Sequence, residues 1–587
     1  MLRRGADIIV DYLAESSVPY AVGVCGHGNI QFLDALRLKG DCIKTITTHH
    51  ESAAGFMADA FFRVTHQPIV TFSSTGPGSY NLPISLANAM ADSSAFLAIT
   101  ANVPVKQFNR GAFQETYWHH QADFSSVVKP FVKRVFQPLK ADTLPAAVRQ
   151  AYTTMLNGRF GPVVLDVPFD MFTEEVITET QGPKEWQVEL DFRSSGNPKV
   201  IESILDILMK AKRPLILAGN GVVLSNAHEK LRRFSKLLQI PVVTTPLAKG
   251  AVDYSDPLFA GEPGRLGSYP GNQACKECDV LLTLGCRFDD RISSSWIKGY
   301  TFNIPPTRHI QIDIDPSELG RNYPVELGVV ADVHGVLAQL LDAAKKRRGP
   351  NKHNKEWLGK LDQWRRLWRP VYEPYLGSND VPIRPERLIG EIRNLLPKDG
   401  ILLADVGIHH NWLVQLWETC QPRTFLHAWG FGAMGFAVCG VLGAKLGAQN
   451  RPCVAVVGDG GFMMHAHAVA TAVEYNIPCV WIVWNNKGFC SIRDMQLAYF
   501  EGNEIATSFV KHRTGELFTP DFAALAESFG AKGLRIEKPS ELRDSIEIAL
   551  KAEEPFVLDV NMSREARLAT AGTWELPPFR HPEPSFP

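Results

Sequence analysis

Short apolar runs that are rich in β-branched residues alternate along this chain with segments of helical periodicity. A helix that joins two strands of one sheet carries the chain back to the end where the first strand began, so the two strands run parallel. Several runs are apolar at nearly every position, which is typical of strands covered on both faces. The sequence therefore predicts an α/β protein built from doubly wound parallel sheets. The predicted strands are residues 43–48, 68–74, 162–167, 214–219, 280–285, 309–315, 453–458 and 479–485.

The length of the chain predicts more than one domain, because 587 residues exceed what a single hydrophobic core covers. Two passages, near residues 175–198 and 345–355, are polar and rich in proline or charge, and we interpret both as linkers. Three domains, each with its own parallel sheet, are expected between and around them. The predicted boundaries are an N-terminal domain (1–180), a middle domain (190–345), a C-terminal domain (365–565) and a C-terminal tail (566–587).

The composition excludes some classes of partner. Lys and Arg total 61 against 62 Asp and Glu, so no net field favours nucleic acid or an anionic membrane. Ten cysteines without framework spacing are typical of a reducing compartment, and the pair Cys275 and Cys278 has no second pair or histidine cluster near it in sequence. Residues 430–448 are dominated by glycine and alanine and include Lys445, so they are a poor membrane span. We expect a cytoplasmic protein.

A carboxylate and an amide follow two consecutive predicted strands of the C-terminal domain. Asp459 follows the strand 453–458, and Asn486 follows the strand 479–485. A right-handed crossover brings the carboxyl ends of both strands to one edge, which is where open α/β sheets bind ligands. One carboxylate and one amide oxygen suit a magnesium ion whose other ligands are phosphate oxygens. Three glycines would let backbone N–H groups approach that phosphate, namely Gly458, Gly460 and Gly461.

The sequences GDG at 458–460 and NN at 485–486 resemble the signature of thiamine-diphosphate-dependent enzymes. The resemblance implies that Asp459 and the second asparagine, Asn486, bind magnesium, with the backbone carbonyl of Gly488 as a third protein ligand. It also implies thiamine diphosphate as the cofactor. The three domains would then bind its pyrimidine, a nucleotide and its diphosphate, in that order along the chain.

The same resemblance assigns residues that would activate and support the cofactor. Glu51 opens a predicted helix in HHESAAGF and corresponds to the activating glutamate of the family, although the helix dipole alone also favours an acid there. GFGAMGFAVCG resembles an acetolactate synthase segment, which implies Met434 beneath the cofactor rings and the Gly432 carbonyl near its amino group. An ordinary core methionine is the alternative for Met434. Because the two halves of the site come from different subunits in this family, a homodimer or homotetramer is implied.

The resemblance covers essentially the whole chain and is closest to the acetolactate-synthase-like branch. AFQE matches that branch and implies that Gln114 lies beside the thiazolium. LTLGCRFDDRISSSW and HIQIDIDPSELGRN resemble its flavin-binding domain, which implies FAD near Arg287 and Asp313. ADP, or a middle domain without a nucleotide, is the alternative, since the lone GxG at 219–221 is weak evidence for a dinucleotide.

Three features depart from that branch. Met495 aligns with a tryptophan that selects the second 2-oxo acid in acetolactate synthases. The loop GVCGHGN, with Gly26 and His27, and a C-terminal Trp574 are more similar to enzymes that hydrolyse cyclic 1,2-diones. The resemblance implies that the His27 loop faces the cofactor, where an imidazole could move protons at neutral pH. A histidine that caps its own loop is the alternative.

Two histidine pairs have no assigned role. His465 and His467 replace an Asn and a Gln of the acetolactate synthase pattern, and His465 could approach the diphosphate or pack between helices. The role of His119 and His120 is left open.

The predicted enzyme uses thiamine diphosphate and magnesium to decarboxylate a 2-oxo acid and to transfer the acyl-anion equivalent to a second carbonyl. Hydrolysis of a cyclic 1,2-dione, without release of carbon dioxide, is the alternative. A nicotinamide dehydrogenase would need a complete GxGxxG at the start of a helix, where the chain has only GNGVVL. A catalytically inactive relative should lack Glu51 or a metal ligand, and both are present.

Overall fold

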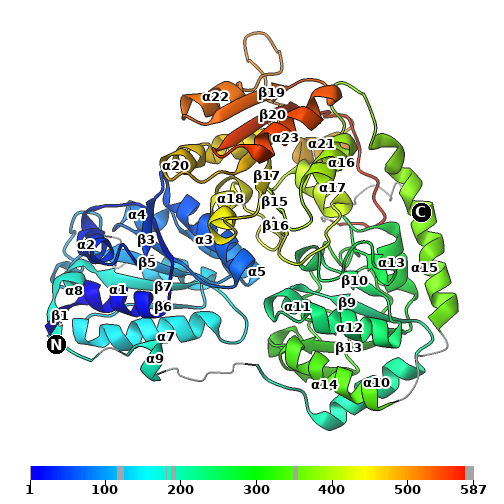
Figure 1. Cartoon of the computed structure of the whole chain (residues 1–587), viewed down its shortest axis with the longest axis horizontal. Helices are drawn as coiled ribbons and strands as arrows, with labels where there is room; N and C mark the ends of the chain where they lie inside the picture. The colour runs from blue at the N-terminus through cyan, green and yellow to red at the C-terminus, as the bar shows by residue number, and fades with distance from the viewer. Residues whose placement is uncertain (1, 116–123, 180, 187–192, 348–353, 576–587) are drawn as a thin grey trace.

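The computed structural model describes residues 2–115, 124–179, 181–186, 193–347 and 354–575. These residues form three six-stranded parallel sheets, each flanked by helices (Figure 1). The predicted fold class, an α/β protein of three doubly wound parallel-sheet domains, is confirmed. Every strand predicted from the sequence is present, with both ends within two residues of the prediction.

The N-terminal sheet has the strand order β3-β2-β4-β5-β7-β6. Its strands are β2 (Tyr20–Gly23), β3 (Lys44–Thr47), β4 (Val70–Ser73), β5 (Leu97–Asn102), β6 (Arg134–Phe136) and β7 (Val163–Pro168). Its helices include α1 (Gly5–Glu15), α2 (Ile30–Leu38), α3 (Glu51–Thr65), α4 (Pro77–Tyr80), α5 (Pro83–Asp92) and α7 (Leu144–Leu156).

The middle sheet has the order β11-β10-β9-β12-β13-β14. Its strands are β9 (Pro214–Ala218), β10 (Val242–Thr244), β11 (Phe259–Gly261), β12 (Val280–Leu284), β13 (Arg308–Asp313) and β14 (Leu327–Val330). Its helices include α10 (Pro198–Lys210), α11 (Asn220–Leu224), α12 (His228–Leu238), α13 (Tyr269–Glu277) and α14 (Val333–Lys346). Counted within the domain, the order is 3-2-1-4-5-6, which is that of dinucleotide-binding folds.

The C-terminal sheet has the order β16-β15-β17-β18-β20-β19, the same relative order as the N-terminal sheet. Its strands are β15 (Ile401–Ala404), β16 (Phe425–His427), β17 (Cys453–Gly458), β18 (Val480–Asn485), β19 (Lys532–Ile536) and β20 (Phe556–Asn561). Its helices include α16 (Pro385–Leu395), α17 (Ile408–Leu416), α18 (Phe436–Gly447), α19 (Asp459–His465), α20 (Ala468–Glu474), α21 (Cys490–Tyr499), α22 (Phe522–Ser528) and α23 (Leu542–Lys551). Helix α15 (Asn354–Trp368) runs along the outside of the middle domain toward this sheet (Figure 1).

The N-terminal and C-terminal domains pack through helices α3 and α18, which lie side by side in one hydrophobic core. Glycine is required at the contact, because a Cβ at Gly443 would stand 1.9 Å from the carbonyl oxygen of Met57. A Cβ at Gly440 would stand 3.1 Å from the Cβ of Ala60. The glycine- and alanine-rich stretch of the sequence therefore serves a close contact between helices. Among the described helices, none combines the length and the hydropathy that crossing a bilayer requires.

The described parts of the first predicted linker and of the C-terminal tail make specific contacts. Strand β8 (Glu175–Ile177) pairs antiparallel with β1 (Leu2–Arg4). In the tail, the backbone N–H groups of Thr573 and Glu575 donate to the hydroxyls of Ser294 and Ser295, at 3.1 and 2.7 Å. The start of the tail therefore lies against the middle domain.

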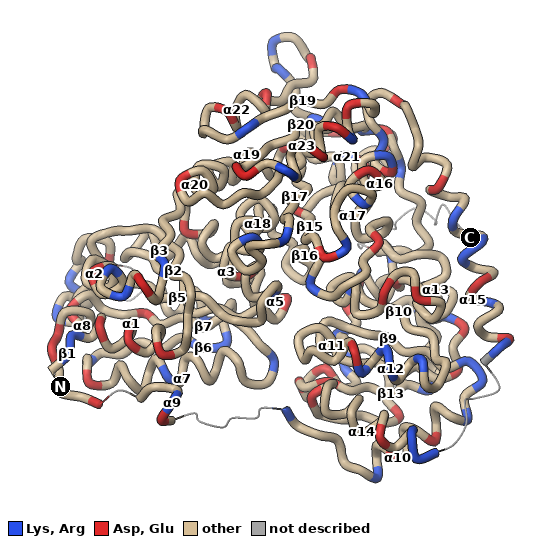
Figure 2. The backbone as a smooth tube through the Cα atoms, viewed as in Figure 1, with Lys and Arg blue, Asp and Glu red and all other residues tan. Residues whose placement is uncertain are grey.

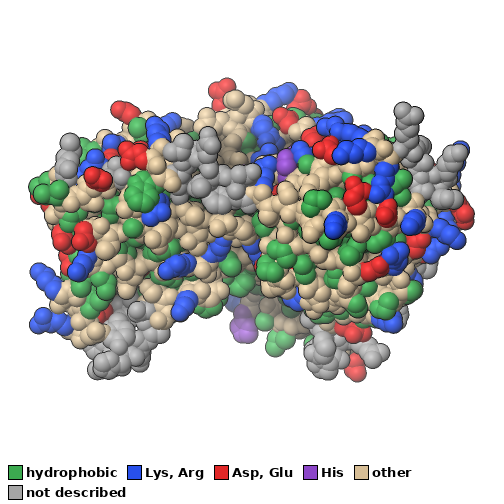
Figure 3. All heavy atoms as spheres, turned by 90° about the horizontal axis from the view of Figure 1, so that it is seen from below, with side chains coloured by type: hydrophobic (Ala, Val, Ile, Leu, Met, Phe, Trp, Pro, Cys, Tyr) green, Lys and Arg blue, Asp and Glu red, His purple; other side chains and the backbone are tan. Residues whose placement is uncertain are grey.

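Charges of both signs are interspersed over all three domains (Figure 2). The face seen from below in Figure 3 shows the same mixture, and it is hollowed between its left and right halves. This agrees with the near-zero net charge of the chain.

Candidate functional site

Each of the three sheets has one point at which successive strands are added on opposite sides, and ligands of open α/β sheets bind outside the carboxyl ends of the strands at that point. In the C-terminal sheet the point lies between β15 and β17, and in the N-terminal sheet between β2 and β4. In the middle sheet it lies between β9 and β12. The loops that follow these strands carry part of the site residues predicted from the sequence, and the others lie at the carboxyl ends of neighbouring strands, namely β3, β5, β13, β16 and β18.

Asp459 and the segment Asn486–Gly488 meet at the C-terminal sheet, as the strand positions predict. Strands β17 and β18 are neighbours and run parallel. Asp459 is 1% exposed, and its carboxylate accepts the N–H of Gly488 at 3.1 Å and its own helix's Gly460 N–H at 2.7 Å. The other asparagine of the pair, Asn485, instead donates to Asp559 and Thr519. This arrangement brings the predicted metal ligands to one place.

The charge of Asp459 is not balanced by the protein. Burial raises the pKa of this carboxyl to about 7, against four backbone N–H groups that lower it. Within the described ranges no Lys, Arg or His forms an ion pair with it. A buried carboxylate beside an amide, without a counter-charge, is the donor set that a hard divalent cation would complete. The residues present therefore fit magnesium.

The glycine loop after β17 is packed so closely that no side chain fits. A Cβ at Gly460 would lie 2.4 Å from the ring of Phe489, and one at Gly461 would lie 2.4 Å from Oδ2 of Asp405. Glycine is therefore required at both positions, and a loop without side chains at the start of a helix is what an approaching phosphate requires.

His409 is a site residue that the sequence analysis missed. It lies on α17, its ring is buried, and its Cε1 would be 2.9 Å from a Cβ at Gly458. Burial lowers the pKa of His409 to about 3, so the imidazole is neutral. Its Nε2 is buried and has no hydrogen-bond partner among the described residues. An orphaned ring nitrogen against the glycine loop fits a phosphate oxygen as its missing partner.

The segment with Gly432 and Met434 lies beside the glycine loop. Cε of Met434 is 3.8 Å from the Cβ position of Gly461. Gly432 has φ of +72°, and nothing lies within 4 Å of its Cβ position, so a ligand could approach its backbone. The segment is held by the buried Asp405, which accepts the N–H groups of Gly435 at 2.9 Å and Ala437 at 3.1 Å.

Glu51 lies at the corresponding edge of the N-terminal sheet, as the first residue of α3. Its side chain is buried, with the residue 8% exposed, and Oε2 accepts a hydrogen bond from Asn81 at 2.8 Å. Oε1 stands 3.1 Å from the Cβ position of Gly78, in the helix that follows β4. The carboxylate therefore faces α4 and the residue that follows it, next to the loop after β4.

His27 and Gln114 meet at the same loop through Thr75. The Thr75 hydroxyl lies 3.4 Å from Nε2 of His27 and 3.4 Å from Oε1 of Gln114. His27 is exposed, and the N–H of Gly26 donates to Asn29 at 3.0 Å. The structure thus gathers the three predicted catalytic side chains around one loop.

The two groups of residues lie on different sheets of the chain. In the described part of the chain, no hydrogen bond joins Glu51, His27 or Gln114 to Asp459, Asn486 or Gly488. Both groups lie at the carboxyl ends of their own sheets, and helices α3 and α18 pack between those sheets.

His465 packs between helices, which is one of its two predicted alternatives. Its Nε2 lies 3.2 Å from the Ser52 hydroxyl, and its ring blocks the Cβ position of Gly435 at 2.2 Å. The ring centroids of His50 and His467 lie 6.4 and 5.6 Å from that of His465. These histidines therefore join α3 to α19. His119 and His120 lie outside the described residues.

We expect the half-buried histidines His465 and His467 to lower the stability of the protein in acid. Burial, and then the neighbouring histidines, lower the pKa values of His465 and His467 to about 4. Below the ordinary value near 6.5 the unfolded chain therefore takes up protons that the folded chain does not, so the free energy of unfolding falls as the pH drops from about 6.5 toward 4. We expect each residue to contribute on the order of 1 kcal/mol between pH 7 and pH 5. Urea unfolding as a function of pH measures this, and the double substitution His465→Asn with His467→Gln should flatten the dependence. An unchanged slope in that variant would assign the effect to other groups.

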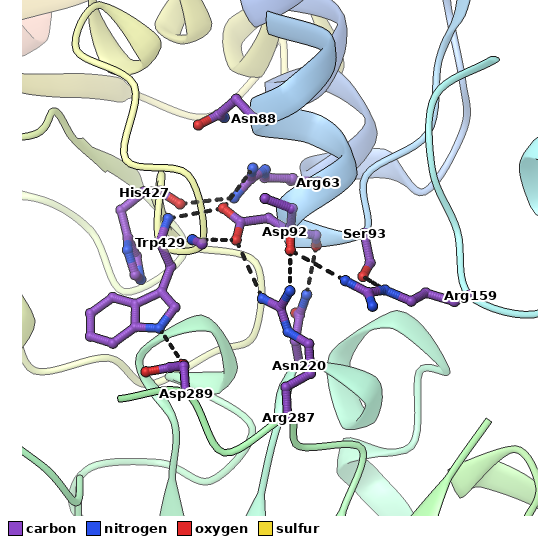
Figure 4. Close-up of polar contacts among 12 residues, drawn as sticks. Arg63, Asn88, Asp92, Ser93, Arg159, Asn220, Arg287, Asp289, His427 and Trp429 are labelled. Carbon is purple, nitrogen blue, oxygen red and sulfur yellow. Dashed lines mark hydrogen bonds and ion pairs between the residues drawn. The ribbon is translucent and has the colours of Figure 1, made fainter. Parts of the chain in front are cut away.

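The middle sheet carries a cavity of about 310 Å³ at its own switch point. Arg287 and Asp313, both predicted to bind a nucleotide, line it together with Gly219 and Gly221. Burial raises the pKa of Asp313 to about 6. Part of the cavity wall belongs to the other two domains, as Ser93, Arg159 and Trp429 show in Figure 4.

Four further residues were singled out by the sequence. Trp574 donates its indole N–H to Asp290 at 2.7 Å on the middle domain. Met495 lies on α21, partly buried. Cys275 and Cys278 are buried thiols whose pKa values are raised by burial, which makes them poor nucleophiles and poor metal ligands.

Three family models match this chain, and each falls on one of the three sheets. The N-terminal thiamine pyrophosphate binding domain matches residues 3–123, the central domain of thiamine pyrophosphate enzymes matches residues 201–340, and the C-terminal thiamine pyrophosphate binding domain matches residues 405–560. Fold and domain content together define the class, a thiamine-diphosphate-dependent enzyme.

The chain is also similar to curated proteins over nearly its full length. It is 34% identical to a probable acetolactate synthase large subunit of Methanocaldococcus jannaschii, over 95% of this chain and 91% of that protein. It is 32% identical to one of Methanococcus aeolicus, over 96% and 93%. It is 31% identical to the acetolactate synthase large subunit of Corynebacterium glutamicum, over 96% and 87%. The chain belongs to the acetolactate-synthase-like branch of the thiamine-diphosphate-dependent enzymes and is a carboligase, and no observation favours the dione-hydrolysing alternative.

Proposed function

We propose that this enzyme decarboxylates a 2-oxo acid and joins the remaining acyl group to a second carbonyl compound, which yields a 2-hydroxy ketone or 2-hydroxy acid. The observation that carries the proposal is the buried, uncompensated Asp459 beside Asn486, at the sheet edge where the glycine loop and the orphaned His409 nitrogen converge. The similarity to acetolactate synthase large subunits supports the same reaction.

In this proposal the C-terminal half-site holds the diphosphate and the metal. Asp459, Asn486 and the Gly488 carbonyl bind magnesium, and His409 donates from Nε2 to a phosphate oxygen. Met434 and the Gly432 carbonyl, which lie beside the glycine loop, would contact the rings of the cofactor. Thiamine diphosphate, once bound, supplies a carbon nucleophile and an electron sink for decarboxylation.

We assign the transfer of protons to the N-terminal half-site, which consists of Glu51, His27 and Gln114. Glu51 would form a hydrogen bond with the pyrimidine ring. Its buried carboxyl group is held by Asn81, next to the loop after β4. His27 and Gln114, joined through Thr75, face the reacting groups of the substrates. The exposure of His27 suits a residue that exchanges protons with solvent.

A complete site needs two chains in this proposal. Glu51 and Asp459 lie on different sheets of one chain, and no hydrogen bond among the described residues joins the two groups. Apolar side chains are exposed near both, among them Phe113, Phe431 and Met464. A homodimer, or a tetramer of such dimers, would cover them and bring Glu51 of one chain to the metal site of the other.

FAD is the nucleotide we propose for the middle domain. The 3-2-1-4-5-6 strand order is the one in which dinucleotides bind at the switch point, and the cavity lies there. Gly219 must be glycine because its Cβ would stand 2.1 Å from the carbonyl oxygen of Gly285, and Gly285 must be glycine because its Cβ would stand 2.5 Å from Cα of Gly221. ADP is the alternative and would fill part of the same cavity. A comparison of the affinities for FAD and ADP distinguishes the two nucleotides.

The domain boundaries 1–180, 190–345 and 365–565, with the tail 566–587, remain our proposal. So does a cytoplasmic location, which is supported by the ten cysteines, all free in the structure.

The decisive experiment follows carbon dioxide and product by NMR after reconstitution with thiamine diphosphate and magnesium. We expect carbon dioxide and a 2-hydroxy ketone or acid from pyruvate or a larger 2-oxo acid, and no consumption of cyclohexane-1,2-dione. Consumption of the dione without carbon dioxide would contradict the proposal and restore the hydrolase alternative. A lack of turnover with every substrate would contradict both.

A further inference from the structure

Asp92, the last residue of α5, is buried where all three domains meet (Figure 4). Its carboxylate accepts the backbone N–H groups of Trp429 at 2.9 Å and of Gly430 at 2.7 Å, both from the C-terminal domain. Arg63 of α3 donates to the same carboxylate at 3.2 Å and to the carbonyl of His427 at 2.8 Å. One buried carboxylate thus holds the start of the segment that follows β16.

The same residue is tied to the middle domain. Asn220 donates to the Asp92 backbone carbonyl at 3.1 Å, and the guanidinium of Arg287 lies 3.7 Å from the Asp92 carboxylate. Arg287 also donates to the carbonyl of Ala91. Both Asn220 and Arg287 line the nucleotide cavity, so the wall of the cavity and the segment after β16 share one anchor.

Trp429 directly links the wall of the cavity to the segment after β16. Its indole N–H donates to Oδ2 of Asp289 at 2.7 Å, and the guanidinium of Arg291 stacks 4.0 Å from its ring centre. Asp289 and Trp429 are themselves cavity-lining residues. A molecule that fills the cavity would therefore contact Trp429 and Asp289 and restrain both side chains.

The other end of this segment lies in the candidate cofactor site. Gly432 and Met434 follow Trp429 by three and five residues, and Asp405 holds Gly435 at the far end. Between these two anchors, Phe431 is exposed and nothing surrounds the Cβ position of Gly432. The backbone at Gly432 is thus open on one side while Ala433 is buried, and the position of this open backbone depends on the two anchors at Trp429 and Gly435.

We propose that Trp429 is a positioning residue that couples the two ligand sites, so that a nucleotide in the middle-domain cavity tightens the binding of thiamine diphosphate by ordering the segment 428–435. This inference rests on the proposed function for both sites. Because the coupling is a difference in free energy, it must be reciprocal, and thiamine diphosphate must tighten nucleotide binding by the same factor.

Isothermal titration calorimetry on the full-length protein, freed of nucleotide, measures the coupling. Thiamine diphosphate with magnesium is titrated with and without saturating FAD, and FAD is titrated with and without thiamine diphosphate. We expect each ligand to tighten the other by about tenfold. In Trp429→Phe, which keeps the ring but removes the indole donor, both ligands should bind singly and the factor should fall to about twofold or less.

Trp296→Phe is the matched control. Trp296 lies in the same loop region as Asp289 and donates its indole N–H to Phe288 at 2.8 Å, but it does not line the cavity. We expect full coupling in this variant. In the wild-type protein, FAD should also slow amide hydrogen exchange in peptides covering residues 428–435, a measurement that does not depend on any variant folding.

The outcomes separate this inference from the proposed function. If both ligands bind the wild type but with independent affinities, or if Trp429→Phe keeps the full coupling, the role of Trp429 is wrong while the proposed function stands. If thiamine diphosphate does not bind, or neither FAD nor ADP binds, the proposed function fails and this inference fails with it. ADP in place of FAD tests whether the adenylate half is sufficient for coupling.

Discussion

Replacing Glu51 by glutamine is expected to lower kcat by about 10²- to 10⁴-fold, the range that a positioned proton-transfer group contributes. Glutamine has the same shape, and its side-chain oxygen can still accept the hydrogen bond from Asn81 at the position of Oε2. The fold and the affinity for thiamine diphosphate should therefore change little. Turnover of the 2-oxo acid and calorimetric titration of the cofactor measure the two effects separately.

Glu474→Gln is the matched control for this substitution. Glu474 is an exposed acid of α20 that pairs with His49 at 3.1 Å, and it belongs to neither half-site. We expect its turnover to equal that of the wild type. Retention of wild-type kcat in Glu51→Gln would remove Glu51 from the mechanism, and loss of cofactor binding would make it a binding residue only.

Replacing Asp459 by asparagine is expected to abolish the stabilisation that magnesium and thiamine diphosphate give to the wild type. A ligand at a hundredfold excess over its Kd stabilises the native state by about 2.7 kcal/mol, and the variant should lose this shift because an amide cannot replace the anionic ligand. The ligand-free variant should be at least as stable as the wild type, since it no longer buries a charge without a counter-charge. Thermal unfolding with and without both ligands measures both effects.

Asp313→Asn provides the comparison for Asp459→Asn. Asp313 is also a buried acid at the end of a strand, with its pKa raised to about 6, but it lies in the middle domain. In the absence of nucleotide, magnesium and thiamine diphosphate should stabilise this variant against thermal unfolding as much as they stabilise the wild type. If the two ligands stabilise Asp459→Asn as much as the wild type, the metal must bind elsewhere.

Mixing the two inactive variants tests whether the site is shared between chains. In a mixed dimer of Glu51→Gln and Asp459→Asn, one of the two sites would contain both wild-type residues. Random exchange should then restore about a quarter of wild-type activity. If the mixture stays inactive after subunit exchange is verified, each chain must complete its own site.

The strands, and the meeting of Asp459 with the segment after β18, could be predicted because their signals are local. Residues 453–458 and 479–485 are long and apolar, and the acid and the amide stand directly at their ends, so a parallel crossover brings them together. His409 was missed for the opposite reason. The strand before it, β15, is only four residues long and was not predicted, and without that strand the histidine has no place at the sheet edge.

The N-terminal site was predicted in part. Glu51, His27 and Gln114 were named by resemblance, and each lies next to the loop after β4, as a shared site requires. What linked them, the Thr75 hydroxyl, carries no signal of its own, because a threonine in a glycine-rich turn has many structural reasons to be there. His465 was left open between two roles, and only its contact with Ser52 and its place against Gly435 identify it as a packing residue.

The sequence by itself determined the fold class, the strands and the residues that would hold a metal-bound diphosphate, since each depends on residues that are close in the chain or on one crossover. The tertiary structure alone decided that Glu51 and Asp459 lie apart on two sheets, and that Asp92 joins Trp429 from 337 positions away while Trp429 joins Asp289 across 140. Contacts of this kind arise when three independently folded sheets pack together, and no local periodicity encodes which loops meet at such a junction.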